Sequence, residues 1–352
     1  MLRNIVNRRL ARFLILGVLV AGMIFDVGLV PSAISTTVQL GLHANSGTQP
    51  AAPDSGQKIV IGANLVDVAV SVSDTRGRFV PGLTRDEFEV FDNGVKQQLT
   101  HFSDLDAPIS IGIVYDKSGS MDRSINRSAR ALARFIETSH DQDDFFLVTF
   151  AGRAAIAEDF SRGDPGTMLN RLASVRPGGQ TALYDAVLLA LDQLKQGAHA
   201  RRALLVISDG RDNHSDHTFS DLRAAVRESG VIIYAVGITA NSNDRQPDVG
   251  RLVLTQIAES SGGRAFFPVP YDEASTAQDC ARIALELRHQ YSLGFYPTDT
   301  PGTTRYHRIR VKLDAPRGLG RLSLSYRTTY PSFNSPDIGK ALDSPSARPQ
   351  AQ

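Results

Sequence analysis

A short polar motif closes one of the apolar runs of this 352-residue chain. In "VYDKSGSM", an acid and two hydroxyls occupy alternate positions as Asp116, Ser118 and Ser120. Two more polar side chains have comparable places: Thr181 lies in the glycine-rich stretch "RPGGQTALYDAV", and Asp209 directly follows the apolar run "ALLVIS". If the fold brings these segments together, they supply two carboxylates and three hydroxyls to one place.

This all-oxygen set suits a hard divalent cation. Mg²⁺ prefers octahedral oxygen ligands at about 2.0–2.1 Å and usually keeps several waters. Zinc is disfavoured, because neither Cys nor His belongs to the set. With only two carboxylates from the protein, the ion would stay electrophilic, and an open position would attract an external carboxylate. As an isolated turn, Asp116 and Ser118 could instead cap the next helix, but the two companion residues favour a site.

The segment from Ile109 to about Gln290 must position these residues, and it alternates apolar runs with amphipathic helical patterns. Such alternation predicts an α/β domain with a doubly wound, mostly parallel sheet covered by helices on both faces. Ligands bind such sheets at the carboxyl ends of the strands, where Asp116 and Asp209 are expected. We expect parallel strands at 109–115, 145–150, 203–208 and 231–238, an antiparallel edge strand at 154–160, a last strand at 262–267, and helices over 125–136, 183–194 and 277–287.

The segments on either side of this domain have a period of two, which is typical of half-buried β-strands. Residues 59–107 carry a valine alternation and an Asn93-Gly94 hairpin signal, and residues 291–331 carry three further strand patterns. Each segment is marginal alone, so we expect one seven-stranded, sandwich-like β domain with the α/β domain inserted into it. Two separate β modules are the alternative.

The polar motif and its companions resemble the von Willebrand factor type A family: "DKSGS" is similar to its Asp-x-Ser-x-Ser signature, and "GGQTALYDA" and "ISDGRDN" match its later threonine and aspartate. The resemblance spans about 109–290, and we place the domain at 108–290. It implies a six-stranded sheet and a metal-ion-dependent adhesion site that binds Mg²⁺ or Mn²⁺ and, through it, a Glu or Asp of a protein partner. The implied ligands are Asp116, Ser118, Ser120, Thr181 and Asp209, with Gly119, Gly179 and Gly210 supporting the loops. The flanks "VSVSDTRGRFVPGLTRDEFEVFDNG" and "YSLGFYP" resemble bacterial von Willebrand factor A-related proteins described from Acidobacteria.

The N-terminus predicts export. Several arginines precede the apolar run "FLILGVLVAGMIF" (13–25), as in a secretory signal. We expect 1–33 to be a signal peptide cleaved after Ala33, with a retained membrane anchor as the alternative. Both place the remainder outside the cytoplasm, in the cell envelope, as a periplasmic, secreted or anchored protein. Residues 34–58 and 332–352 are rich in small residues and proline, and we expect a flexible linker and a disordered tail.

Composition and the remaining motifs limit the function. With a net charge of +1 and no basic stripe, the chain gives no sign of a nucleic-acid partner or of its oligomeric state. The single cysteine, Cys280, falls on an apolar helix stripe, and no Ser–His–Asp or Cys–His arrangement stands out. We therefore expect a binding protein and not an enzyme; the alternatives are a metal-stabilised envelope scaffold, or a metal-assisted hydrolase with His214 or His217 as base. We expect the loop 212–217 to be solvated and no second metal site, and Lys117 to point to solvent.

Overall fold

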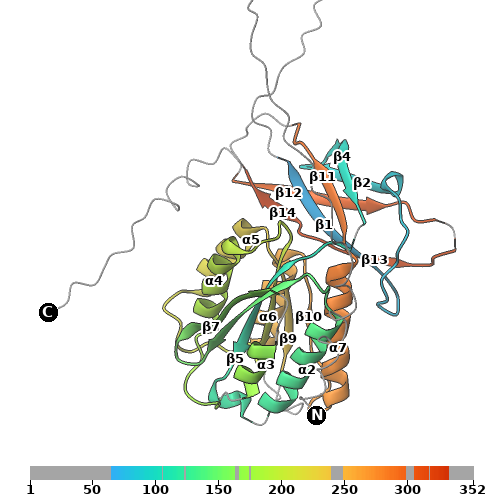
Figure 1. Ribbon diagram of the computed structural model, residues 1–352. Coiled ribbons are helices and arrows are strands. Elements are labelled where there is room, and N and C mark those ends of the chain that lie inside the picture. The colour runs from blue at the N-terminus through green and yellow to red at the C-terminus, as the bar shows by residue number, and fades with distance from the viewer. Residues whose placement is uncertain are drawn as a thin grey trace, which may run out of the picture. The chain divides into compact units, whose positions relative to one another are not determined.

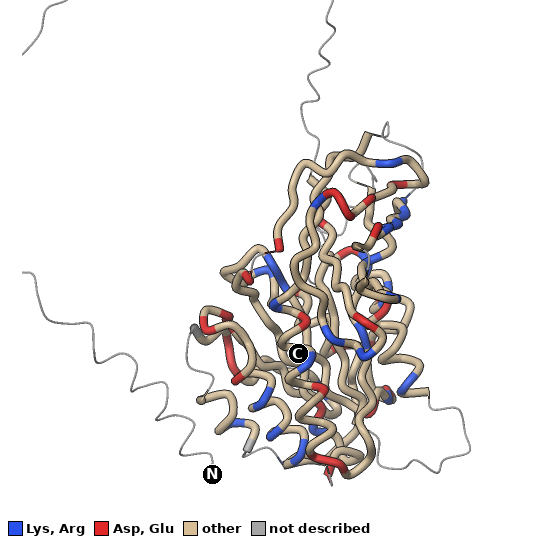
Figure 2. The backbone as a smooth tube through the Cα atoms, turned by 90° about the vertical axis from the view of Figure 1, so that its right-hand side faces the viewer, with Lys and Arg blue, Asp and Glu red and all other residues tan. Residues whose placement is uncertain are grey.

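The computed structural model describes residues 65–332, apart from 105, 123, 163–165, 174–175, 239–248, 299–304 and 317. The predicted signal or anchor, the predicted linker and the tail beyond Ser332 lie outside these residues. Within the described part, no helix combines the length and apolarity that crossing a membrane requires. Figure 2 shows Lys and Arg interspersed with Asp and Glu along the described chain.

A six-stranded sheet in the order β10-β9-β8-β5-β6-β7 forms the centre of the α/β domain. Its strands are β5 (Ser110–Asp116), β6 (Asp144–Phe150), β7 (Ala154–Arg162), β8 (Arg202–Ser208), β9 (Ile232–Gly237) and β10 (Ala265–Phe266). All neighbours are parallel except β7, which runs antiparallel to β6 at the edge. The doubly wound, mostly parallel sheet predicted from the alternating pattern is therefore confirmed.

Helices cover both faces of this sheet (Figure 1). They are α2 (Ile125–Thr138), α3 (Gly166–Ala173), α4 (Leu183–Gln193), α5 (Phe219–Ser229), α6 (Val249–Ser261) and α7 (Glu273–Arg288), with short 3-10 helices at Arg85–Glu87, Gly119–Met121 and Leu194–Gln196. One core packs α2, α3 and α7 against the sheet, and a second core packs α4, α5 and α6 against its other face. Cys280 lies fully buried in the first core, where burial raises the pKa of its thiol to about 12. The apolar stripes predicted α2, α4 and α7, whereas α3 and α5 were not predicted.

The two flanking β segments are interleaved in two four-stranded sheets, β13-β1-β11-β4 and β14-β12-β2-β3. From the first segment come β1 (Val66–Asp74), β2 (Phe88–Asp92), β3 (Val95–Gln97) and β4 (Leu99–Ser103), and from the second β11 (Tyr291–Phe295), β12 (Tyr306–Leu313), β13 (Leu322–Ser325) and β14 (Thr329–Pro331). Each sheet pairs strands from both segments, as at Val66 with Phe295 and Phe88 with Leu313. Both sheets contribute to one apolar core, so the α/β domain is an insertion within a single β unit.

Within the described residues, the β unit has eight strands and not the seven predicted. The stretch "VKQQLTHF" after the hairpin divides at Gln98, so that β3 and β4 belong to different sheets. Gln97 and Leu99 are both buried, and the period of two therefore continues through the crossing unchanged. The Asn93-Gly94 turn has φ values of 48° and 89°, as a two-residue hairpin of this kind requires.

Candidate metal centre

Three loops meet at the carboxyl edge of the α/β sheet. The loop after β5 contacts the glycine-rich loop before α4, because the Gly119 N–H donates to the Gly179 carbonyl oxygen at 3.2 Å. The glycine-rich loop in turn joins the loop after β8, because the Thr181 N–H donates to Asn213 Oδ1 at 2.8 Å. These contacts bring the segments that carry all the predicted ligands to one edge.

Two of the supporting glycines have a backbone conformation that favours glycine. Gly179 and Gly210 have φ values of +84° and +81°, a region that residues with a Cβ rarely adopt. A Cβ on Gly210 would also lie 2.3 Å from the Gly250 carbonyl oxygen at the start of α6. A side chain at either glycine would therefore strain the backbone of its loop.

Asp116 is fully buried at the end of β5. Its Oδ1 accepts the Ser118 N–H at 2.8 Å, and its Oδ2 accepts the Ser208 hydroxyl at 2.6 Å. Burial, with a smaller contribution from the nearby charge of Asp209, raises the pKa of its carboxyl to about 6, although the hydrogen bonds from Ser118 and Ser208 oppose the rise. A cation beside this carboxylate would favour its charged form and lower the pKa.

The other predicted ligands lie on these three loops, and two of their hydroxyls are close together. Ser118 Oγ is 3.0 Å from Ser120 Oγ, with Ser118 buried and Ser120 exposed. Thr181 is buried directly before α4. Asp209 is half-buried after β8, and its Oδ1 accepts the Arg211 N–H at 3.0 Å.

The donor set fits a hard divalent cation, because every predicted ligand offers oxygen and two hydroxyl oxygens already lie together beside a buried carboxylate. Among the described residues, no group of three or more His, Cys, Asp or Glu could hold a metal ion. That finding agrees with a set that contains only two carboxylates and relies on hydroxyls.

Sequence reasoning missed two residues that hold the site. Ser208 Oγ donates to Asp116 and accepts the Gly210 N–H at 3.0 Å, so it orients the buried carboxylate and the turn after Asp209. Asn213 anchors Thr181 through the bond given above. The available signal for Ser208 was a hydroxyl that ends the otherwise apolar run "ALLVIS"; Asn213 carried no comparable signal.

Lys117, between the proposed ligands, is partly exposed. Its N–H donates to the Phe150 carbonyl oxygen and its own carbonyl accepts the Gly178 N–H, both at 2.8 Å. The backbone at this position is thus fixed on both sides, while the outward direction of the ammonium group stays a prediction.

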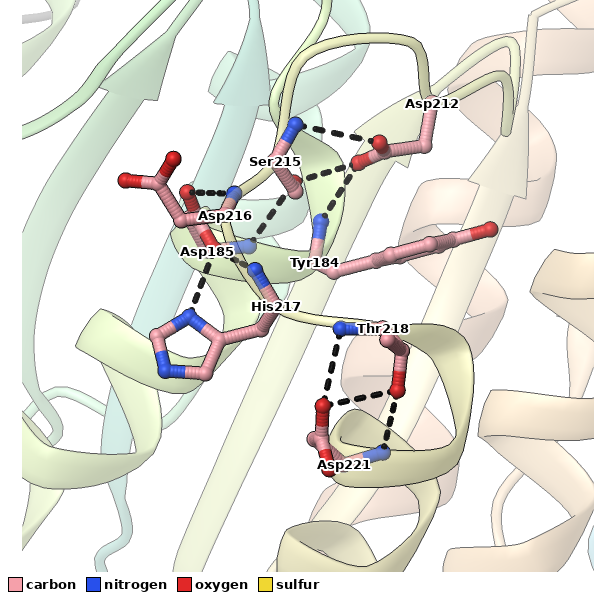
Figure 3. Close-up of polar contacts among 8 residues, drawn as sticks. All are labelled: Tyr184, Asp185, Asp212, Ser215, Asp216, His217, Thr218 and Asp221. Carbon is pink, nitrogen blue, oxygen red and sulfur yellow. Dashed lines mark hydrogen bonds and ion pairs between the residues drawn. The ribbon is translucent and has the colours of Figure 1, made fainter.

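The loop after Asp209 is bonded to the start of α4 (Figure 3). His217 Nδ1 lies 2.8 Å from Asp185 Oδ1, and Asp212 accepts bonds from Tyr184 and Ser215. The carboxylates of Asp185 and Asp212 are therefore engaged within the protein.

Comparison with known proteins gives a family match for the α/β domain and no match among curated proteins. Solved structures with similar folds include the PilB minor pilin from Streptococcus sanguinis, which is 13% identical with a TM-score of 0.42 over 52% of this chain and 61% of the pilin. A von Willebrand factor type A protein from Catenulispora acidiphila is 13% identical, with a TM-score of 0.42 over 76% of this chain and 72% of that one. Proximal thread matrix protein 1 from the mussel byssus, described with a zinc-occupied MIDAS motif, is 19% identical, with a TM-score of 0.44 over 56% and 49%.

The family match covers the site. The model of the family described as von Willebrand factor type A domain matches residues 110–279, from the first residue of β5 into α7. All the proposed ligands fall within that range, and the fold observed over it is the one that the motif implied. Residues 110–279 of this chain therefore match the von Willebrand factor type A domain.

Proposed function

We propose that this protein is an exported binding protein that holds Mg²⁺ or Mn²⁺ at its von Willebrand factor type A domain and binds an acidic side chain of a protein partner there. The proposed ligands are Asp116, Ser118, Ser120, Thr181 and Asp209. Domains of this family commonly mediate protein–protein interactions and often bind a divalent metal. The observation that carries the proposal is a fully buried carboxylate, Asp116, with converging hydroxyls beside it and a raised pKa.

The chain's own groups explain why such a site would take up a carboxylate. When bound, the ion would supply positive charge and an open coordination position. Ser118 and Ser208 hold both oxygens of Asp116, which fixes the orientation of that carboxylate. Because only Asp116 and Asp209 contribute charge, the protein would not saturate the ion electrostatically, and a partner's Glu or Asp would complete the set.

Export to the cell envelope rests on the N-terminal sequence. The basic head and apolar run within 1–33 support a signal peptide or an anchor, and the α/β domain would then act outside the cytoplasm. Membership of the bacterial subfamily described from Acidobacteria rests on the flanking motifs alone and remains part of the proposal.

Two alternatives remain for the same fold. A hydrolase would need a base beside the metal, and His214 and His217 are the candidates; the bond from His217 Nδ1 to Asp185 leaves its Nε2 available. A scaffold would use the β unit for contact and the metal only for stability. Partners captured by the protein that remain bound after chelation would favour the scaffold.

Metal titration of the purified full-length chain tests the proposal. Wild type is expected to bind Mg²⁺ or Mn²⁺, and Asp116→Ala and Asp209→Ala are expected to weaken binding by about 100-fold or more, because each removes a charged ligand. Asp122→Ala is the matched control: it removes an exposed carboxylate from the same loop without touching the proposed set. Equal binding by wild type and both ligand variants would refute the proposed site.

A further inference from the structure

The start of helix α4 is capped by another segment of the chain. The first N–H groups of a helix lack partners within it, and a Ser, Thr, Asp or Asn at the N-cap usually accepts them. The N-cap of α4 is Ala182, which has no side chain to do so. Instead, Asp212 Oδ2 accepts the Tyr184 N–H at 2.9 Å, and Ser215 Oγ accepts the Asp185 N–H at 3.2 Å (Figure 3).

The same two segments are bonded in the opposite direction as well. The Asp185 carboxylate accepts the backbone N–H groups of Asp216 at 2.9 Å and of His217 at 3.2 Å. Ser215 Oγ also donates to Asp212 Oδ2 at 2.6 Å, so the two capping groups are bonded to each other. We call this reciprocal set the latch; it joins 181–185 to 212–217.

The latch connects two different ligand loops. Thr181 stands at one end of it, with its N–H bonded to Asn213 Oδ1 and its carbonyl accepting the N–H groups of Asn213 and His214 at 2.9 and 3.0 Å. Asp209 lies three residues before Asp212 on the other segment. The distance between these two proposed ligands is therefore set by bonds that need no metal.

We propose that Asp212 and Ser215 are positioning residues for the metal ligands. By capping α4 from the neighbouring loop, they hold Thr181 at a fixed distance from Asp209. This inference rests on the proposed metal-binding function. When the ligands are already ordered before the metal binds, binding does not carry the free-energy cost of ordering them. Groups that hold ligands in place typically change metal affinity by about 10-fold to 100-fold when removed.

The next helix supplies a control within the same stretch of chain. Helix α5 is capped by its own residues, because Thr218 Oγ1 accepts the Asp221 N–H at 3.3 Å and Asp221 Oδ2 accepts the Thr218 N–H at 2.9 Å. Figure 3 shows this self-contained cap beside the latch. A variant that loses it should lose comparable helix stability without disturbing Thr181.

Mn²⁺ titration of the full-length chain, with amide hydrogen exchange at 181–185, tests the latch. Asp212→Ala and Ser215→Ala are expected to weaken Mn²⁺ binding by about 10-fold and to speed exchange at Tyr184 and Asp185. Thr218→Ala is expected to keep affinity within about twofold of wild type, because a lost α5 cap does not reach the ligands.

Asp216→Ala separates positioning from simple charge. It removes one negative charge from the same loop, and that side chain takes no part in the latch, which uses the Asp216 backbone N–H. Affinity lost equally in Asp216→Ala and Asp212→Ala, or in Thr218→Ala and Ser215→Ala, would overturn the positioning role while leaving the metal site intact. Absence of Mn²⁺ binding by wild type would overturn the proposed function itself.

Discussion

Arg201 and Asp116 are charged groups of the same sheet, one before β8 at its amino edge and one at the end of β5 at its carboxyl edge. The Arg201 guanidinium donates to the carbonyl oxygens of Ala107 at 2.8 Å and Leu287 at 2.6 Å, and burial lowers its pKa. Burial instead raises the pKa of Asp116, whose surroundings are a cluster of hydroxyls. Each edge therefore holds a charged group away from water, but Arg201 is bonded to backbone carbonyls and Asp116 to serine groups.

The difference separates a structural edge from a binding edge. Ala107 and Leu287 lie where the chain passes between the β unit and the α/β domain, so Arg201 bonds to both crossings at once. At the carboxyl edge the polar groups contact one another and retain oxygen lone pairs for an ion. Substitutions at the amino edge should therefore change the free energy of unfolding, and those at the carboxyl edge should change metal affinity.

Replacing Arg201 is expected to have the largest effect on stability. Arg201→Met keeps much of the apolar stem but leaves the carbonyl oxygens of Ala107 and Leu287 without their charged donor. We expect a loss of about 3 kcal/mol in the free energy of unfolding, since two partly buried acceptors lose charge-assisted bonds. Urea unfolding measures the change, and Mn²⁺ affinity is expected to stay unchanged.

The neighbouring arginine provides the control for this variant. Arg202 Nη2 donates to the Lys195 carbonyl oxygen at 3.4 Å, a longer and exposed bond. Arg202→Met is expected to cost less than about 1 kcal/mol, as is usual for a single exposed contact. If the two variants were equally stable, or if Arg201→Met weakened metal binding, the division between the edges would fail.

Two buried serines compare the edges with the same substitution. Ser208→Ala at the carboxyl edge removes the donor to Asp116 Oδ2 and the acceptor of the Gly210 N–H. We expect it to weaken Mn²⁺ binding by about 10-fold, because the group that orients a ligand is lost, and to cost about 1–2 kcal/mol of unfolding free energy. Isothermal titration and urea unfolding give the two quantities.

Ser110→Ala at the amino edge is the matched control. Ser110 is also fully buried, and its Oγ accepts the His199 N–H at 3.0 Å. We expect a similar cost of about 1 kcal/mol in unfolding free energy with no change in metal affinity. A fall in affinity in Ser110→Ala, or none in Ser208→Ala, would contradict the comparison.

The two edges also differ in how far sequence could predict them. Asp116 and Asp209 follow apolar runs whose order places them at one edge, so their convergence could be predicted from strand polarity. The role of Arg201 could not be predicted, because its partners are the backbone carbonyls of Ala107 and Leu287, 94 and 86 residues away. Every residue has a backbone carbonyl, so the sequence does not indicate which ones accept a hydrogen bond.

The helix caps near the site divide in the same way. Thr218 and Asp221 form a local pattern three residues apart, which a sequence can reveal. The cap of α4 cannot be read locally, because Ala182 offers no oxygen and Asp212 lies 28 residues beyond Tyr184. The sequence also gave no sign that the chain passes from one β-sheet to the other at Gln98, because the period of two persists through that residue.

Metal binding by the five proposed ligands remains a prediction.

The smallest expected effect concerns an ion pair that joins the two crossings. Arg288 Nε donates to Asp106 Oδ2 at 2.9 Å, with both side chains about 30% exposed (31% and 29%). Burial alone would raise the pKa of the Asp106 carboxyl, but the bond and charge of Arg288 outweigh it, and the pKa is lowered. Asp106→Asn should therefore destabilise the protein only where the carboxyl is charged.

The sign of the pH dependence follows from that lowered pKa. The pair contributes stability above the ordinary pKa of about 3.9, and the contribution is lost as the pH falls through the lowered value of the folded state. Chemical unfolding at pH 7 should show a deficit of about 0.5 kcal/mol for Asp106→Asn, reduced by salt, and no deficit near pH 2. Asp104→Asn, which removes an exposed carboxylate two residues earlier, should show no deficit at either pH. A deficit in Asp106→Asn that persists at pH 2 would mean that Asp106 acts through packing and not through charge.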